Sequence, residues 1–203
     1  MTSRIDRRSK PGAQAALLAA LQSLLADGAS FSSITVEDLT TRAGKSRSSF
    51  YAHFPDMATL LRAGASTPYT ELNRAAQTWW SLGSRSRQAD LEAALSGIVD
   101  TYRDNALVIG ALYDAATVDT TTRRLIEAAV DEWISMCTAH FELGRREHWV
   151  RNDLHARETA TIVVWMLERG LDQLLTDCTS RRRRSLIAGL ADWIWHAVYH
   201  GGS

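Results

Sequence analysis

The sequence predicts an all-α protein in which a small N-terminal helical domain precedes a larger helical domain. Its 203 residues, 45% of them hydrophobic and 23% charged, suffice to bury a core without disulfides or a metal. Only 12 glycines and three prolines interrupt stretches rich in Ala, Leu, Arg and Glu, and these residues favour helix over sheet. Apolar residues also recur at the spacing of amphipathic helices along most of the chain.

Composition also narrows the class of protein and its compartment. No segment approaches the roughly 18 to 20 apolar residues of a membrane span. The N-terminal "MTSRIDRRSKPG" is charged, and no apolar signal core follows it. Cys137 and Cys178 lack the spacing of a disulfide framework or a zinc site, so we expect free thiols. These features predict a cytoplasmic protein without a membrane partner, metal or cofactor.

The neutral total charge hides a basic front end. Residues 1–62 carry eight Lys or Arg and five Asp or Glu, a net charge of +3, and the remainder of the chain carries −3. Such an asymmetry is a weak indication of a polyanionic partner. We expect residues 1–10 to form a basic flexible arm, which either contacts DNA or is a solvated tail. Its cations are Arg4, Arg7, Arg8 and Lys10.

End signals predict the first two helices. A helix over residues 13–27 carries an apolar stripe, and Gly28 follows it as a typical C-terminal cap. A second helix is expected over residues 36–42. Thr35 is its expected N-cap, and Asp38 can reach back to Thr35 in a capping box.

A glycine turn then leads into a third helix. Gly44 provides a left-handed turn, Ser46 can cap a helix over residues 47–54, and Pro55 ends it. Helix, tight turn, helix is the helix-turn-helix arrangement, whose second helix enters the DNA major groove N-terminus first. The polar side chains around this helix are Lys45, Ser46, Arg47, Ser48, Ser49, Tyr51 and His53. From these residues alone, a DNA-reading helix and an ordinary capped helix remain alternatives.

The segment "ITVEDLTTRAGKSRSSFYAHFPDMATLL", residues 34–61, resembles the N-terminal signature of the TetR family of transcriptional regulators. Within that family, "SRSSFYAHFP" and the closing "DWIWHAVYHG" are most similar to the ethionamide-resistance-type repressors. The resemblance implies that residues 11–62 form a helix-turn-helix DNA-binding domain. It also implies that residues 63–203 form a helical ligand-binding and dimerisation domain.

The resemblance implies residue roles as well. Thr35, Tyr51 and His53 would contact phosphates, and the polar residues from Lys45 to Ser49 would face the groove. One position departs from the family pattern, because Met57 stands where a phosphate-gripping lysine is usual. The neighbouring Asp56 would repel DNA unless it caps the following helix.

Helical spacing predicts six further helices after the third one. A long fourth helix continues to Trp80, although Pro68 is expected to bend or break it. The others are expected at residues 91–102, 107–116, 122–149, 156–177 and 182–200. The run "RRRR" at 181–184 is either a solvated turn or a second DNA site; the helix dipole disfavours cations there, which favours the turn.

Two stripes of large side chains in this second domain are either ordinary core or the wall of an apolar pocket. The family resemblance implies a pocket for a small apolar or amphipathic inducer. The candidate pocket residues are Tyr113, Trp133, Met136, Cys137, His140, Phe141, Trp165, Met166, Arg169 and Trp195.

The last two helices are apolar on more than one face. One face can pack within the subunit, and burial of the second face requires a partner chain. An isologous homodimer would satisfy this need and would present two reading helices to a palindromic operator. The candidate interface residues are Val164, Leu167, Leu171, Leu174, Leu186, Leu190, Trp193 and Ala197.

The sequence therefore predicts a ligand-responsive transcriptional regulator that binds double-stranded DNA, most simply a repressor released by its inducer. A helical interaction protein that has lost DNA binding is an alternative, and an enzyme is a weaker one. His140, His148 and His155 do not have the spacing of a common metal site, and no phosphate loop or nucleophile elbow is present. Glu168 and Arg169 are expected at a solvated helix edge rather than as a buried pair.

Overall fold

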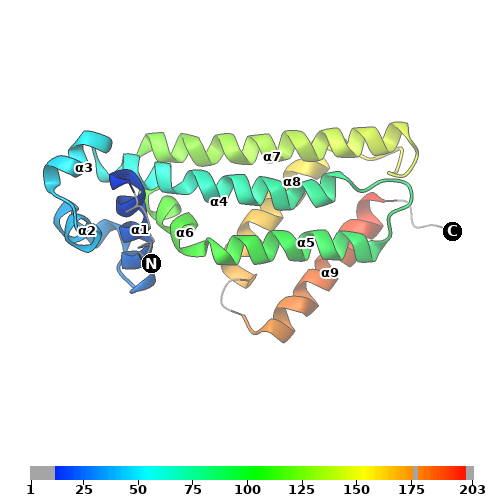
Figure 1. Ribbon diagram of the computed structural model, residues 1–203. Coiled ribbons are helices and arrows are strands. Elements are labelled where there is room, and N and C mark those ends of the chain that lie inside the picture. Colours follow the sequence, from blue (N-terminus) through cyan, green and yellow to red (C-terminus); the bar gives the residue numbers. More distant parts are fainter. Residues whose placement is uncertain (1–11, 176–177, 200–203) are drawn as a thin grey trace, which may run out of the picture. The chain divides into compact units, whose positions relative to one another are not determined.

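The computed structural model describes residues 12–175 and 178–199, and the regular elements in these residues are helices (Figure 1). The all-α prediction is confirmed. The basic arm over residues 1–10 lies outside the described residues. The elements are α1 (Ala13–Ala26), η1 (Phe31–Ser33), α2 (Val36–Ala43), α3 (Arg47–His53), α4 (Met57–Trp80), α5 (Gln88–Asp104), α6 (Ala106–Ala116), α7 (Thr120–Arg146), α8 (Ala156–Gly170), η2 (Leu171–Leu175) and α9 (Ser180–Val198).

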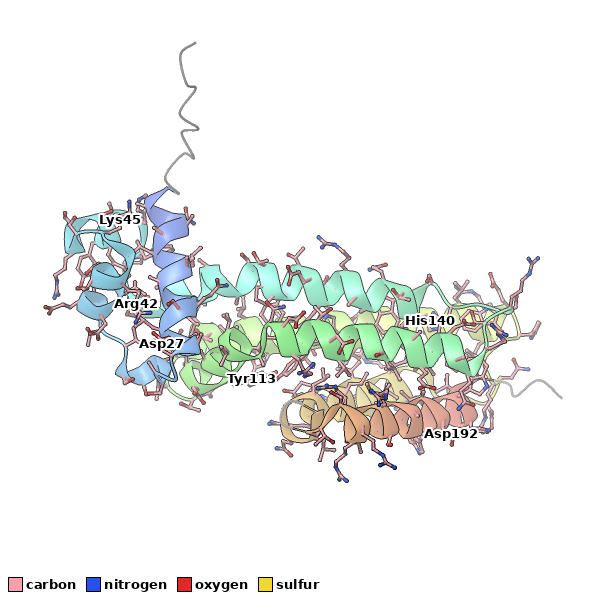
Figure 2. All side chains as sticks on the ribbon, turned by 60° about the horizontal axis from the view of Figure 1, so that its bottom comes forward. Asp27, Arg42, Lys45, Tyr113, His140 and Asp192 are labelled. Carbon is pink, nitrogen blue, oxygen red and sulfur yellow. The ribbon has the colours of Figure 1, made fainter. Side chains whose placement is uncertain are left out.

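The chain divides into two compact units, an N-terminal unit that ends at Gly64 and a C-terminal unit that begins at Ala65. In the N-terminal unit α1, α2 and α3 pack against one another. Their shared core consists of fully buried side chains, among them Leu17, Leu21, Leu39 and Phe50. At the edge of this core the Arg42 guanidinium lies 2.7 Å from Asp27 and donates to Ser23 at 2.6 Å, which ties α2 to the end of α1 (Figure 2).

The two turns of this unit form as their residues dictate. Thr35 and Asp38 make the reciprocal capping box, with the Asp38 N–H donating to Thr35 Oγ1 at 3.1 Å and the Thr35 N–H donating to Asp38 Oδ2 at 3.0 Å. Gly44 ends α2 with φ of 61°, in the left-handed region that a side chain would disfavour. The Ser46 hydroxyl then accepts from the Ser49 N–H at 3.1 Å and caps α3.

The C-terminal unit is a helical bundle. The C-terminal part of α4 lies beside α5 and α7, α8 packs on α7, and α9 packs on α5 (Figure 1). Its buried residues are mainly Leu, Ile, Val, Ala and aromatic side chains, so burial of apolar area dominates its stability. None of the helices in the described part of the chain is long and apolar enough to cross a membrane.

Two helix predictions require correction. Pro68 does not break α4, which runs as one helix through it; a bend at Pro68 stays a prediction. The proline is buried, and it lacks the N–H that would donate to the carbonyl one turn earlier. The single helix expected over residues 156–177 is instead α8 followed by a π-helical turn at η2. The wider turn changes which side chains of this segment face inward, a change that a regular 3.6-residue period does not anticipate.

Candidate functional site

The N-terminal end of α3 presents polar side chains to solvent. Ser46, Arg47 and Ser48 are exposed, and Lys45 and Ser49 are half-buried. No salt bridge engages Lys45 or Arg47 among the residues that the structure describes. The end of the helix therefore offers two cations and several hydroxyls, which together suit a phosphate or a base edge.

Aromatic residues hold this polar end in place from the opposite face of α3. Phe50 and Phe54, four residues apart, are buried, with ring centroids 6.1 Å apart. Tyr51 packs edge-on against Phe50, yet 52% of its surface is exposed, and His53 is exposed as well. Tyr51 and His53 thus carry a hydroxyl and an imidazole at the rim of the same exposed surface. We call Lys45–Ser49 with Tyr51 and His53 the α3 surface.

Thr35 and Asp56 are already occupied as helix caps. The Thr35 hydroxyl accepts from the Asp38 N–H and donates to the Asp38 carboxylate at 2.5 Å. That donated bond and the one from the Thr35 N–H to the same carboxylate hold the pKa of Asp38 below its usual range. A phosphate that binds Thr35 must compete with Asp38 for the hydroxyl proton. Asp56 directly precedes α4, which begins at Met57. Its carboxylate accepts from the Thr59 N–H at 2.6 Å, so Asp56 is the N-cap of this helix.

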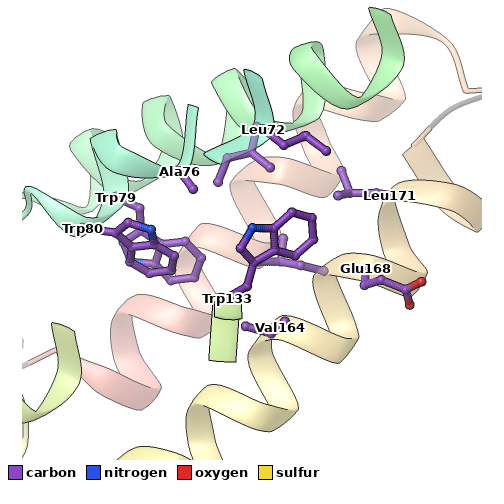
Figure 3. Close-up of a pocket in the computed structure, with 10 residues that line it drawn as sticks. Leu72, Ala76, Trp79, Trp80, Trp133, Val164, Glu168 and Leu171 are labelled. Atoms are coloured by element: carbon purple, nitrogen blue, oxygen red, sulfur yellow. The ribbon is translucent and has the colours of Figure 1, made fainter. Parts of the chain in front are cut away.

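The C-terminal unit contains an apolar cavity of about 50 Å³. Three indole rings dominate its wall, those of Trp79, Trp80 and Trp133 (Figure 3). The lining comes from α4, α5, α7, α8 and η2, and consists of Leu72, Ala76, Trp79, Trp80, Ile98, Trp133, Val164, Leu167, Glu168 and Leu171. Such a wall suits an apolar body and excludes a strongly hydrated one.

Polar groups gather at one end of this cavity. Glu168 is only 7% exposed, and its carboxylate is close enough to the Tyr113 hydroxyl to perturb it. Burial, together with the charge of Glu168, raises the pKa of Tyr69 to about 12 and raises that of Tyr113 further. Close by, the Trp133 Nε1–H donates to Asn73 Oδ1 at 2.5 Å. Glu168 is therefore buried at the cavity wall and does not lie at a solvated helix edge.

A second buried network lies in the same unit and involves His140. Tyr199 Oη accepts from the Trp79 Nε1–H at 2.8 Å and lies 2.9 Å from His140 Nε2. Because the tyrosine oxygen already accepts from Trp79, its own proton is free to go to a neutral His140. Burial lowers the pKa of His140 to about 4, although the backbone of Trp80 acts in the opposite direction. Trp149 and Trp195 stack on Tyr199.

The predicted pocket residues do not form one site. Of these residues, Trp133 lines the cavity, and Tyr113 is near Glu168 at its wall. Figure 2 shows Tyr113 and His140 toward opposite ends of the C-terminal unit. Buried residues Cys137, His140 and Phe141, with half-buried Met136 and Trp195, lie on α7 and α9 outside the cavity lining. Burial also raises the pKa of the Cys137 thiol, as expected for an inert core cysteine.

The prediction for the two faces of α8 is reversed in the structure: the face expected at a dimer interface lines the cavity, and the face expected in the pocket is exposed or half-buried. Val164, Leu167 and Leu171, expected at a dimer interface, are buried and line the cavity. Trp165, expected in the pocket, is 44% exposed, and the Arg169 side chain is 61% exposed; Met166 is half-buried. The indoles of α4 and α7 already fill the interior, so α8 turns its slimmer aliphatic stripe inward. On α9 the predicted stripe is at the surface: Trp193 is exposed, and Leu186, Leu190 and Ala197 are half-buried.

Two family models match the chain. One, described as bacterial regulatory proteins of the tetR family, matches residues 17–63, and the other, described as the C-terminal domain of the transcriptional regulator EthR, matches residues 91–200. The second match alone covers more than half of the chain. The chain belongs to the TetR family of transcriptional regulators. Proteins of this family are typically DNA-binding regulators without enzymatic activity.

Solved structures of transcriptional regulators share the fold at low sequence identity. PfmR from Thermus thermophilus is 16% identical with a TM-score of 0.68, covering 89% of this chain and 97% of its own. A protein from Saccharomonospora viridis, described as a transcriptional regulator and solved in complex with choline, is 18% identical with a TM-score of 0.70, covering 93% and 98%. NalD, the secondary repressor of the MexAB-OprM multidrug efflux pump in Pseudomonas aeruginosa, is 13% identical with a TM-score of 0.68, covering 96% and 100%. No curated protein matches the chain.

Several residues that line the cavity of this TetR-family regulator are not among the predicted pocket residues. The adjacent pair Trp79 and Trp80 could have been included, because two large apolar side chains at the end of a long helix must be buried on two sides of it. Leu72, Ala76 and Ile98 carry no such signal, since aliphatic residues at helical spacing look alike whether they line a cavity or fill a core. Three or more metal-ligating side chains do not gather anywhere in residues 12–175 or 178–199.

Proposed function

We propose that this regulator represses transcription by binding a palindromic operator as a homodimer, in the compartment that holds the DNA, and that a small apolar or amphipathic inducer releases it. The exposed α3 surface is the observation that carries the proposal. Its hydroxyls and cations project from a helix end whose opposite face is fixed by Phe50 and Phe54. The match of residues 91–200 to the EthR model supports a further proposal, that the C-terminal unit is nearest the ethionamide-resistance type.

The apolar cavity is the proposed inducer site. Its volume of about 50 Å³ is smaller than most drug-sized molecules, so an inducer must push side chains aside as it enters. Trp80 and Trp133 are only half-buried, so we expect their indoles, rather than the buried Trp79, to shift as the inducer enters. That the Saccharomonospora viridis relative was solved with choline supports the view that this fold accepts a small organic ligand.

We propose that α4 couples the inducer to the DNA. Leu72, Ala76, Trp79 and Trp80 of this helix line the cavity, whereas its first turns belong to the N-terminal unit. Pro68 has no N–H to donate to the carbonyl of residue 64, where the two units divide, so the helix is weakest at that turn. If the inducer favours the DNA-free arrangement, linkage requires that it weaken DNA binding by the same factor, typically corresponding to about 1 to 3 kcal/mol.

We expect two substitutions on the α3 surface to separate base reading from phosphate binding. Arg47→Ala should lower the preference for the cognate duplex over a scrambled one, by about 1 to 3 kcal/mol for a lost base contact. Tyr51→Phe should weaken binding to both duplexes equally. The measurement is a fluorescence titration against the DNA upstream of the protein's own reading frame. Arg124→Ala, an exposed arginine on α7, is the matched control. Unchanged affinities for both α3 variants would contradict the proposal.

The proposed dimer uses the exposed apolar faces of α8 and α9. Ile162 and Trp165 on α8 and Trp193 on α9 are exposed, and burying them against a second copy would remove a large apolar area from water. Trp193→Glu should therefore shift the chain from dimer to monomer in sedimentation velocity experiments. Val118→Glu, at a residue 87% exposed on the α6–α7 connection, should leave the association state unchanged. A wild-type chain that sediments as a monomer at micromolar concentration would rule the dimer out.

A further inference from the structure

We propose that the inducer carries a protonated amine, which Glu168 binds, on an apolar body held by the surrounding indoles. This inference rests on the proposed function of the cavity as the inducer site. Of the ten described residues that line the cavity, Glu168 is the charged one; the others are aliphatic or tryptophan. A ligand that filled the cavity with apolar atoms alone would make no use of this carboxylate.

The burial of Glu168 indicates a binding role. Taking a carboxylate out of water is costly unless hydrogen bonds or a positive charge replace the lost hydration. Glu168 is 7% exposed, and the neutral Tyr113 hydroxyl is the polar group that its charge perturbs most. Its atom Oε2 is buried and has no hydrogen-bond donor among the described residues. The carboxylate therefore keeps an acceptor position that the folded chain leaves unfilled.

Among the described side chains, Arg169 is the charged group paired with this carboxylate, and it is a weak competitor for a ligand. Its Nε lies 3.3 Å from Oε2, outside hydrogen-bond geometry, and its side chain is 61% exposed. An arginine held in water at the surface neutralises a buried carboxylate only in part. Tyr69, which also senses the charge of Glu168, is uncharged at neutral pH because its pKa is about 12.

The geometry of the cavity fits an amphiphile with its cation at one end. Figure 3 shows Glu168 on the side away from Trp79 and Trp80, with Trp133 between them, and the carboxylate points away from these indoles. The carboxylate thus lies beyond the indole-lined part of the wall. An alkyl or aryl body can lie against Trp80 and Trp133 while an ammonium group at its end reaches Glu168. The faces of the indoles also attract a cation, whereas a carboxylate or phosphate ligand would be repelled.

Three probes of equal chain length test the proposal on the full-length protein: hexylamine, 1-hexanol and hexanoate. At about pH 7 the amine is protonated, since alkylamines resemble the lysine side chain, whose pKa is about 10.4. Calorimetric titration should show the amine binding at least tenfold more tightly than the alcohol, and hexanoate more weakly than either. In Glu168→Gln the tenfold preference for the amine should vanish while the affinity for 1-hexanol stays the same. Glu158→Gln, an exposed glutamate on the same helix, should keep the preference.

The outcomes separate this inference from the proposed function. If 1-hexanol binds the wild type as tightly as hexylamine, or if Glu168→Gln keeps the preference, the amine proposal is overturned and the cavity remains an inducer site. If none of the three probes binds, the cavity is not an inducer site, and the amine proposal is overturned with it. If circular dichroism shows that Glu168→Gln does not fold, the proposal is decided by the wild-type preference for hexylamine over 1-hexanol and by the same measurement on Tyr113→Phe. That variant keeps the charge of Glu168 and must keep the preference.

Discussion

Replacing Gly144 by alanine is expected to lower the free energy of unfolding by about 2 kcal/mol, the usual cost of overpacking. A Cβ at this position would lie 2.6 Å from Cζ3 of Trp149 and would also overlap Cγ2 of Val150. Neither neighbour can give way easily, because Trp149 stacks on Tyr199 and Val150 pairs with Tyr199 in an antiparallel bridge. The strain outweighs the gain of up to about 1 kcal/mol that alanine brings to a helix.

The matched control for this prediction is Gly97→Ala. Gly97 lies in α5 with open space around the position of its Cβ, so alanine there should leave stability unchanged or raise it by up to about 1 kcal/mol. Urea denaturation monitored by circular dichroism measures both variants. If Gly144→Ala were as stable as the wild type, the packing described for the end of α7 would be wrong.

Lowering the pH from about 7 to about 4 is expected to remove roughly 3 kcal/mol of stability through His140 alone. The folded chain holds the pKa of His140 at about 4, against 6.5 for an unperturbed histidine. Between these two values the unfolded chain binds more protons than the folded chain, so the free energy of unfolding falls as the pH falls. The contribution of neutral His140 is complete above pH 6.5 and is lost as the pH reaches about 4.

Variants isolate this histidine from the carboxylates that titrate over the same range. His140→Gln should be less stable than the wild type near neutral pH, because it disturbs the hydrogen bonds around Tyr199, but its stability should depend less on pH. His196→Gln, at an exposed position on α9, should follow the wild-type profile. Urea unfolding at about pH 7.5 and pH 4.5 gives the comparison. Parallel profiles for His140→Gln and the wild type would show that His140 does not titrate as described.

The N-terminal unit was predictable because short-range chemistry defines it. The capping box of Thr35 and Asp38, the left-handed turn at Gly44 and the cap at Ser46 each involve residues within a few positions of one another. Local hydrogen bonds and backbone conformations of this kind can be read from the sequence directly. The resulting helix-turn-helix signature is also what carried the family resemblance, which the family models confirm.

The C-terminal unit was less predictable because long-range packing decides which helix face turns inward. The periods of Trp165 and of Val164 on α8 are equally regular, and only the space left by α4 and α7 selects between them. The network of Trp79, His140 and Tyr199 joins residues up to 120 positions apart, so no local pattern announces it. The burial of Glu168 is invisible in the sequence for the same reason.

Hydroxyl-radical footprinting with and without the upstream DNA tests most directly whether the α3 surface reads DNA. Tyr51 and His53 are exposed and have oxidisable rings. His148 and His155 in the C-terminal unit are exposed as well and lie outside the proposed DNA and dimer surfaces. The account predicts that DNA slows the oxidation of Tyr51 and His53 and leaves the oxidation of His148 and His155 unchanged. Equal oxidation of Tyr51 and His53 in free and DNA-bound protein would contradict it.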